Sequence, residues 1–252
     1  DAVAHRLDTN LQRDPNAPPL AEAPNDKEVQ KHNLTHLPYK PWCPACVSYR
    51  ARADKQTRDN QTTASSVPCI SFDFAYTKSM SDQGDEQVGT MVALVYIDSQ
   101  TGFLGCVPVR SKGQYSLMVQ ELVSFPQLLG YTEVVYRADN EPTARQLLKL
   151  VVDTRLRMGL PTRSSTPPPY SHGNALAENC IARIRGLTGS LMFSLFEQLN
   201  MKFSTNSALW SWCMRHACWL LNRYAPHRGV TPYELVYGKG YAGSICQYGE
   251  PI

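Results

Sequence analysis

The sequence predicts an α/β protein built around a mixed five-stranded sheet flanked by helices, and two observations lead to this prediction. Short segments rich in β-branched and aromatic residues stand apart from longer segments with helical periodicity. Their order is three strands, a helix, a strand, a helix, a short strand and then two helices, which is typical of an α/β fold. The predicted strands are 67–76, 90–98, 103–110, 132–139 and a short segment before the Pro-rich run 166–170. The predicted helices are 115–129, 142–158, 174–198 and 205–224.

Turn and breaker residues support the boundaries of these elements. Thr101 and Gly102 mark a turn between the second and third strands, and we expect the first three strands to pair antiparallel. Pro142 stands in a first helical turn, where proline is tolerated, and Gly159 follows the last periodic residue of the same helix. Pro126 interrupts the pattern of the first predicted helix, which is therefore the least regular of the four.

Composition limits the class of protein. With 252 residues, of which 42% are hydrophobic, the chain can bury one sizeable core and still carry a small accessory module. The formal net charge of +3 gives only a weak attraction for nucleic acid, so a DNA-binding function has to rest on local features. No stretch approaches the roughly 18 to 20 apolar residues of a membrane helix, and no signal-peptide pattern is present. We therefore expect a soluble, intracellular protein with no membrane partner.

Changes in composition predict five segments along the chain. They are a disordered tail at 1–28, a small module with two histidines and two cysteines at 29–48, a basic polar linker at 49–66, an α/β core with its C-terminal helix at 67–240, and a tail at 241–252. Because the core has its own hydrophobic interior, we expect it to fold without the small module. The linker carries four basic residues that can touch phosphate, namely Arg50, Arg52, Lys55 and Arg58.

The first chemical pattern is His32-x3-His36-x6-Cys43-x2-Cys46. Two imidazoles one helical turn apart lie on one face of a helix, and a Cys-x-x-Cys turn directs two thiolates at one point. Four ligands of the types that zinc prefers thus fall within fifteen residues, with no acid or base beside them. They predict one structural Zn²⁺. The alternatives are surface histidines beside two free cysteines, or an iron–sulfur cluster, which prefers four thiolates.

The other six cysteines are scattered through apolar segments. Without a secretory signal we expect a reducing compartment, in which disulfides are rare. We interpret these six as small core residues, namely Cys69, Cys106, Cys180, Cys213, Cys218 and Cys246.

The second chemical pattern is a set of three carboxylates at places where an open sheet presents side chains. Asp73 lies in the middle of the first strand, Asp139 ends the fourth, and Glu178 lies early in the helix after the Pro-rich loop. Taken singly, Asp139 is typical of a turn or cap, and Glu178 of a residue that complements the helix dipole. Asp73 is harder to explain in this way, because a carboxylate between Phe72 and Phe74 is costly to bury without a cation.

The helix that carries Glu178 has two distinct sides. At about 100° per residue, one side gathers Leu176, Cys180, Ile184, Leu187 and Leu191, and the opposite side gathers Asn174, Glu178, Ile181 and Arg185. Glu178 is therefore expected to point away from the core. Arg185 shares its face and is predicted to hold a DNA phosphate, the alternative being an exposed Arg–Glu pair. His172, in the loop before Asn174, is a further candidate for a DNA contact.

The Trp-rich helix shows a stripe that we interpret as packing. His216 falls on it, so we expect that histidine to pack rather than to act as a ligand or base. The other members of the stripe are Leu209, Trp212, Cys213 and Leu220.

Several of these segments together resemble the integrases of copia-type LTR retrotransposons, over about residues 29 to 240. PPPYSHGNALAEN resembles the family's Pro-Tyr loop followed by Asn, three residues and the metal-binding Glu, and ADN resembles the second Asp motif. SFDFAYTK with YIDSQTGF resembles the first Asp strand and the strand and turn after it, and LWSWCMRHACWLLNRYAPHRGVTPYELVYGK resembles the family's helix and TPYE tail. The chain departs from the pattern in the short gap between the His and Cys pairs, in Ala175 at the motif Gly, and in Asn179 where Arg is common.

The resemblance implies an RNase H-like core with Asp73, Asp139 and Glu178 as its D-D-E triad. In such a core two Mg²⁺ or Mn²⁺ ions, with Asp73 bridging both, serve 3′ processing and strand transfer of retrotransposon DNA into host DNA. It also implies double-stranded DNA as partner, both element ends and target, with Asn174 among the DNA contacts. We further expect a homo-oligomer that is made in the cytoplasm and acts in the nucleus.

Two other classes of function stay open. A nuclease of the RNase H-like class would show a fourth core carboxylate, for which Asp98 is a candidate, although a turn cap explains that residue as well. A catalytically silent or domesticated DNA-binding protein would keep the fold and the zinc module but lose metal ligands, and all three carboxylates are present.

Overall fold

A computed structural model describes residues 24–50, 67–77, 91–109, 111–113, 115–166, 174–201, 203, 207–226 and 229–250. The strands are β1 (Cys69–Thr77), β2 (Met91–Asp98), β3 (Leu104–Val109), β4 (Val134–Ala138) and β5 (Thr162–Ser165). The helices are α1 (Asp26–Asn33), α2 (Pro44–Arg50), α3 (Tyr115–Leu128), α4 (Pro142–Arg157), α5 (Ala175–Leu199), α6 (Ala208–Tyr224) and α7 (Pro232–Tyr237). Every strand and helix predicted between 67 and 224 is confirmed, with ends shifted by a few residues. No helix in the described part of the chain is long and apolar enough to cross a membrane.

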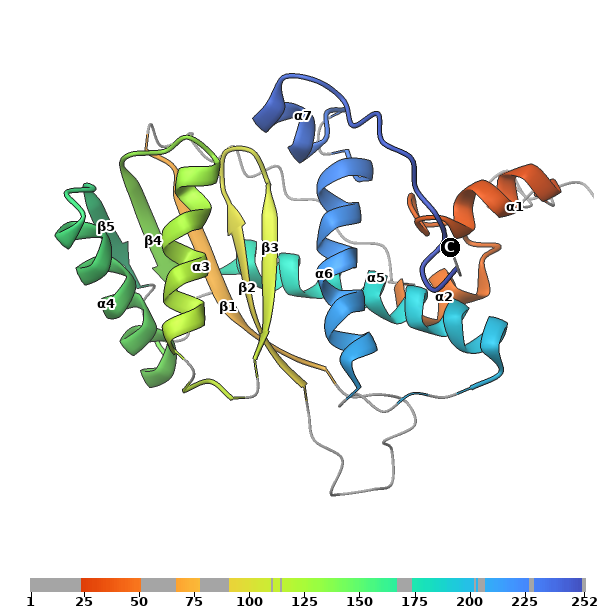
Figure 1. Cartoon of the computed structure of the whole chain (residues 1–252), viewed down its shortest axis with the longest axis horizontal. Helices are drawn as coiled ribbons and strands as arrows, with labels where there is room; N and C mark the ends of the chain where they lie inside the picture. The colour runs from red at the N-terminus through yellow and green to blue at the C-terminus, as the bar shows by residue number, and fades with distance from the viewer. Residues whose placement is uncertain are drawn as a thin grey trace, which may run out of the picture.

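The five strands form one mixed sheet in the order β3-β2-β1-β4-β5 (Figure 1). β1 pairs antiparallel with β2, and β2 antiparallel with β3, as expected, and the turn at Thr101 and Gly102 accounts for the second pairing. β4 and β5 each follow a helix and join the sheet in parallel, β4 beside β1 and β5 beside β4. The predicted α/β fold with a mixed five-stranded sheet is therefore confirmed.

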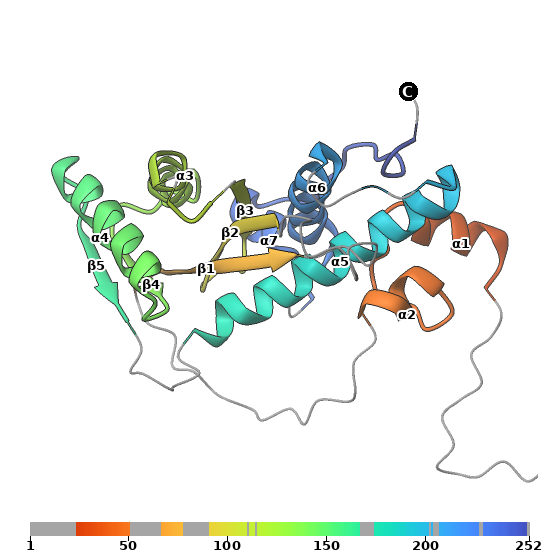
Figure 2. The ribbon, with the colours of Figure 1, turned by 90° about the horizontal axis from the view of Figure 1, so that it is seen from below.

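Helices cover the two faces of the sheet, and the alternation of side chains along β1 divides its residues between them. Phe72 and Phe74 point to the face covered by α3 and α4, where they pack in one core cluster with Leu122 and Leu147. Ala75 points to the opposite face and packs in a second cluster with α5 and α6. Figure 2 shows α3 and α5 on opposite sides of the strands. By the same alternation, Asp73 belongs to the face that α5 covers.

The edge strand β3 is tied to α6 by one side chain. Asn222 donates its amide nitrogen to the carbonyl of Leu104 at 2.8 Å and accepts the Leu104 N–H at 3.0 Å. Asn222 is only 4% exposed, so these bonds form in a dry environment. They fix α6 against the sheet edge.

The zinc module packs directly on α5, which the sequence did not predict. Ser190 of α5 donates its hydroxyl to the carbonyl of Ala45 at 3.1 Å. A Cβ at Gly189 would lie 2.0 Å from the Tyr49 ring, so the bare glycine is what allows the close approach. Phe193 packs on the cluster of buried residues around the two cysteines of the module. That the core folds without the module stays a prediction, and α5 is the helix that packs both in the core and against the module.

The two ends of the described chain are more ordered than predicted. α1 begins at Asp26, inside the segment predicted as disordered, because Asn25 and Glu28 form a capping box with bonds of 2.9 and 3.1 Å. Residues 1–23 and 51–66 lie outside the described residues. In the predicted C-terminal tail, Ile245 and Tyr248 pack against the cluster of α5 and α6, and Tyr248 donates its hydroxyl to the carbonyl of Leu209 at 2.9 Å.

Candidate functional site

The four predicted zinc ligands converge, but not in the way their spacing suggests. α1 ends at Asn33, so only His32 is helical. His36 adopts a left-handed backbone conformation with φ of 51°, and its N–H donates to the carbonyl of His32 at 2.7 Å. The expectation of two histidines one turn apart on one helix is wrong, because the chain reverses after α1 and returns His36 to His32 from outside the helix.

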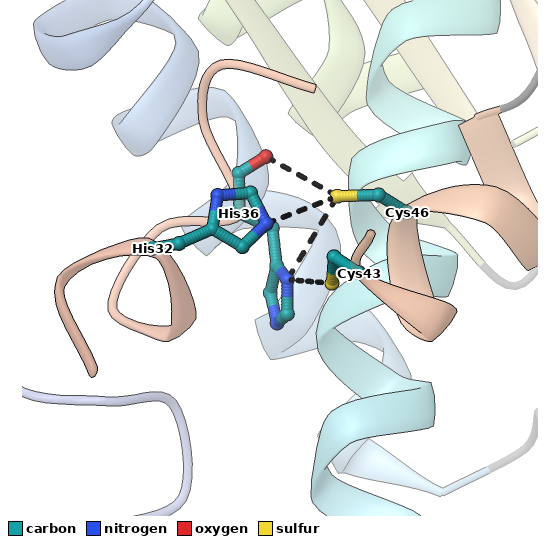
Figure 3. A group of neighbouring side chains, drawn as sticks. All are labelled: His32, His36, Cys43 and Cys46. Atoms are coloured by element: carbon teal, nitrogen blue, oxygen red, sulfur yellow. Dashed lines mark hydrogen bonds between the residues drawn. The ribbon is translucent and has the colours of Figure 1, made fainter. Parts of the chain in front are cut away.

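The cysteines complete a compact group at the start of α2 (Figure 3). Nε2 of His32 lies 3.3 Å from Sγ of Cys46, and Nδ1 of His36 lies 3.5 Å from Sγ of Cys43 and 3.9 Å from Sγ of Cys46. The four ligand atoms all lie within 4.8 Å of one another, and the four residues are buried. In a tetrahedral zinc site, bonds of about 2.0 Å to nitrogen and 2.3 Å to sulfur place N and S about 3.5 Å apart. The group therefore fits Zn²⁺ closely.

The electrostatics of the group favour the metal-binding form of its imidazoles. Burial, followed by the positive charge of Arg50, lowers the pKa of His32 from 6.5 to about 4. Burial likewise lowers the pKa of His36 to about 4. Both rings are neutral at pH 7 and offer lone pairs to a cation. All four ligand positions are filled by protein, so the site is suited to structure rather than to catalysis.

Asp73 and Asp139 lie side by side on neighbouring parallel strands, Asp73 in the middle of β1 and Asp139 directly after the end of β4. Phe72 pairs with Ala138 in the register of β1 and β4, and these two aspartates are the residues that come next. Their alternation places both on the α5 face of the sheet. Asp139 also raises the pKa of Asp73 through its charge, as expected of close carboxylates.

α5 carries Glu178 along β1 between two anchors. Asn174, which precedes α5 and is 1% exposed, donates its amide nitrogen to the carbonyl of Phe72 at 3.1 Å. Arg185 donates a guanidinium N–H to the carbonyl of Tyr76 further along the same strand. Asn174, Glu178 and Arg185 share one face of the helix, since Glu178 follows Asn174 by four residues and Arg185 follows Glu178 by seven. Glu178 therefore lies on the side of α5 that runs beside β1 and Asp73, and its side chain is exposed.

Asp73 is poised to accept a cation. Burial raises its pKa from 3.8 to about 6, and the charges of Asp139 and Glu141 add to the rise, while the Phe74 N–H, which donates at 2.7 Å, and Lys112 oppose it. Lys112 forms an ion pair with Glu141 and lies 5.0 Å from the Phe74 and Tyr76 rings. Neither Lys112 nor Glu141 was predicted from the sequence to lie near Asp73. For Glu141, its position two residues after Asp139 could have indicated this.

The triad is assembled less tightly than the zinc group. Among the described residues, the tetrad of the zinc module is the only group of three or more His, Cys, Asp or Glu whose ligand atoms converge. Asp73 and Asp139 are brought together, and Glu178 is exposed on the side of α5 that runs beside β1. The arrangement is an open set of carboxylates near the middle of the sheet, where β4 ends, and not a closed cage.

The three residues predicted to contact DNA differ in their exposure and in whether the structure describes them. Arg185 is exposed, with part of its guanidinium held by β1. Asn174 is buried, and its bond to Phe72 supports a role in fixing the start of α5 rather than a contact from the protein surface. His172 lies outside the described residues.

Several packing expectations need correction. Leu176 is 38% exposed and Ile181 is 8% exposed, so Ile181, predicted on the outer side of α5, instead packs in the cluster of the sheet, α5 and α6. Trp212, which was predicted to lie on the packed stripe of α6, is 72% exposed. His216 packs as predicted, since it stacks on Trp219 with ring centroids 5.7 Å apart, but it is only half-buried. Of the six cysteines predicted in the core, Cys246 is exposed and Cys69 is half-buried; the others are buried.

Asp98 has a structural explanation. Its Oδ2 accepts hydrogen bonds from the N–H and hydroxyl of Thr101, at 2.8 and 2.7 Å, and from the Tyr131 hydroxyl at 2.9 Å. It pairs with Ile70 in the register, three residues along β1 from Asp73. The turn-cap interpretation is confirmed, and Asp98 is not part of the carboxylate group.

Comparisons with known proteins support the fold. No model of a protein family matches the chain, and no curated protein matches it. The chain is similar to a solved chain of the simian T-cell lymphotropic virus intasome in complex with PP2A regulatory subunit B56 gamma, at 17% identity and a TM-score of 0.50, covering 83% of this chain and 68% of that one. It is also similar to the HTLV-2 integrase catalytic core domain in complex with magnesium, in its trimeric form, at 16% identity and a TM-score of 0.47, covering 67% and 95%. At 17% identity, the likeness to the intasome chain concerns the fold alone.

Proposed function

We propose that this chain is the integrase segment of a copia-type LTR-retrotransposon polyprotein, which carries out 3′ processing and strand transfer of element DNA into host DNA. One observation carries the proposal. Asp73 in the middle of β1 lies beside Asp139 at the end of the parallel neighbour β4, on one face of the sheet, and α5 is anchored to β1 on both sides of Glu178. Three carboxylates so placed on an integrase-core-like fold are suited to two-metal chemistry on phosphodiesters.

The residues present fit a divalent metal. The raised pKa of Asp73 reflects a carboxylate whose ionised form is poorly compensated, which is the situation that a cation relieves. Asp73, Asp139 and Glu178 would hold two Mg²⁺ or Mn²⁺ ions. When bound, such ions supply activation of a water or DNA 3′-hydroxyl and stabilisation of charge on the leaving oxygen.

The chain's own residues position the site and the DNA. Asn174 fixes the start of α5 through Phe72, and thereby sets the distance of Glu178 from β1. Arg185 presents its exposed guanidinium on the same face of α5 and holds a DNA phosphate, and His172 is a further contact in the preceding loop. Contacts of this kind position DNA without reading its sequence, so target choice is loose.

The remaining partners follow from the same proposal. One Zn²⁺ in the tetrad holds the N-terminal module together and takes no part in the chemistry. The substrates are double-stranded DNA of the element ends and of the target. The chain works as a homo-oligomer in the nucleus after synthesis in the cytoplasm.

A catalytically silent or domesticated DNA-binding protein is the second candidate. The exposed position of Glu178 and the lack of a closed carboxylate group among the described residues favour it. An RNase H-type nuclease is disfavoured, because Asp98, the candidate for a fourth carboxylate, is engaged by Thr101 and Tyr131.

Replacement of each carboxylate by its amide separates these functions. Asp73→Asn, Asp139→Asn and Glu178→Gln should each leave duplex binding nearly intact and reduce strand transfer of a short donor duplex in Mn²⁺ by at least ~1000-fold, given the several kcal/mol that metal catalysis supplies. Asp153→Asn, a half-buried carboxylate on α4, is the matched control and should retain activity. Activity that survives in two of the three variants contradicts the triad. A wild-type chain that binds DNA, joins none and gains no stability from Mn²⁺ supports the silent protein.

A further inference from the structure

A small hollow lies at the joint between the zinc module and helices α5 and α6. Its volume is about 170 Å³. The module contributes Tyr39, Tyr49 and Arg50 to its lining, and α5 contributes Arg183. The remaining lining residues are small or aliphatic, and no carboxylate is among them. A concave site with two arginines and no acid has the charge to bind an anion.

The two arginines come from different parts of the fold and are held differently. Arg50 donates to the carbonyl of His36, and its guanidinium lies 3.9 Å from Sγ of Cys46, so the zinc module fixes its direction. Gly186 lets the Arg50 stem lie against α5, since a Cβ there would be 3.0 Å from Cγ of Arg50. Arg183, half-buried on α5, has neither a hydrogen bond nor an ion pair among the described residues. Its donors therefore have capacity for a ligand.

The hollow is separate from the carboxylate site but within reach of the same DNA. Arg183 follows Glu178 by five residues, which is about 7.5 Å along α5 and about 140° around it. The distance along the helix corresponds to about two phosphates of one strand, at about 3.4 Å per phosphate, on DNA that passes across α5 from one side to the other. The volume is below the roughly 300 Å³ of sites that enclose a whole small molecule, and it suits a single phosphate group with Tyr39 beside the sugar.

We propose that this hollow is a nucleic-acid backbone site, in which Arg50 of the zinc module and Arg183 of α5 grip one phosphate of the DNA that lies on the carboxylates. The inference rests on the proposed function and adds a role for the module, because the zinc tetrad orients one of the two cations. A phosphate held in this way ties the module, α5 and the DNA into one unit.

The test measures the binding of a short duplex by fluorescence anisotropy as a function of salt, with two unrelated sequences. Arg183→Gln should weaken binding to both several-fold and lower the slope of log K against log salt by about 0.9, the value for one released counterion. Arg183→Lys should recover most of the slope, since it retains the charge. Arg157→Gln is the matched control, because Arg157 is also a helical arginine but lies on α4, at the far end of the sheet from the module (Figure 1). It should bind like the wild type.

Removal of zinc provides a second arm. If both arginines hold the same phosphate, chelation should lower the slope of the wild type to that of Arg183→Gln and leave the slope of Arg183→Gln unchanged. Equal losses in both proteins would contradict a shared phosphate. An unchanged slope in Arg183→Gln, with a wild type that binds duplex and joins DNA, overturns this site alone. A wild type that binds no duplex overturns the site and the proposed function together.

Discussion

The four His and Cys side chains of the module and the three carboxylates of the core are arranged in opposite ways. The tetrad is closed, since its four residues are buried and their ligand atoms lie within 4.8 Å of one another. The carboxylates are open, with Asp73 and Asp139 adjacent and Glu178 exposed on a different element. A closed set can bind its ion for stability alone, whereas an open set leaves room for substrate. The difference teaches that one chain can combine a closed set of ligands, suited to a structural ion, with an open set of carboxylates that has room for a substrate.

The largest effect is expected at the closed site. The wild type should carry about one zinc per chain, and Cys43→Ser and His36→Ala should carry almost none, because structural zinc contributes on the order of 10 kcal/mol to folding of its module. Metal analysis checks the content. Hydrogen exchange should show loss of protection in α1 and α2, and also in α5 near Ser190, which bonds to Ala45. Cys246→Ser is the control, since that thiol is exposed. Equal zinc in all of these proteins would refute the site.

A smaller effect is expected from the buried charge of the open site. A pKa raised from 3.8 to about 6 means that folded Asp73 takes up a proton more readily than the unfolded chain does. Its contribution to stability is fully present below pH 3.8 and is lost as pH rises through about 6. At pH 7.5, in buffer free of Mg²⁺ and Mn²⁺, Asp73→Asn should therefore be more stable than the wild type, by up to about 3 kcal/mol at 1.36 kcal/mol per pKa unit.

Urea denaturation of the two proteins between pH 5 and pH 8 measures this difference. Both carry the same zinc tetrad, so its titration cancels in the comparison. Added Mn²⁺ should stabilise the wild type and not Asp73→Asn, which would reverse their order. A variant that is less stable than the wild type at every pH would show that Asp73 is compensated within the protein.

The smallest effect concerns the anchor of α5. Asn174→Ala removes the bond to Phe72 and should cost about 1 kcal/mol of stability. Thr231→Ala is the matched control, because the Thr231 hydroxyl caps α7 by accepting the Glu234 N–H at 3.1 Å, and its loss costs a similar amount. Thermal unfolding in Mn²⁺ distinguishes the two. Only Asn174→Ala should lose part of the stabilisation by the metal, since it alone loosens Glu178; equal responses would mean that Asn174 is merely structural.

The sequence predicted what depends on local pattern. The strands and helices between 67 and 224 follow from periodicity and breakers, and Asp73 is conspicuous because a carboxylate between two phenylalanines needs a partner. Four ligands of the types that zinc prefers within fifteen residues were also recognisable. The left-handed turn at His36 was not, because histidine is enriched in that conformation but only a small share of histidines adopts it.

The remainder depends on contacts between distant segments. Gly186 and Gly189 look like weak points of a helix in the sequence, and only the packed module explains them. Trp212 was expected to be buried because it is apolar and lies on the apolar stripe of its helix. Helical periodicity identifies such a stripe, but it does not show which residues of the stripe are covered by the rest of the chain. Arg183 stands out as a candidate anion-binding residue only in the structure, where Arg50, which is far away in the sequence, lines the same hollow.

Asn222 has a consequence for how copies of this chain can meet. The two bonds of its amide to Leu104 imitate the partner that a further strand would offer, so the backbone of β3 is already satisfied at that point of the edge. An exposed edge is a template on which another polypeptide can add by main-chain pairing, and a side chain that fills the template discourages such growth. The width of the sheet is thus limited from within. A second copy that meets this edge would therefore contact side chains, and such a contact can be reversible and geometrically selective, unlike the open-ended addition of strands.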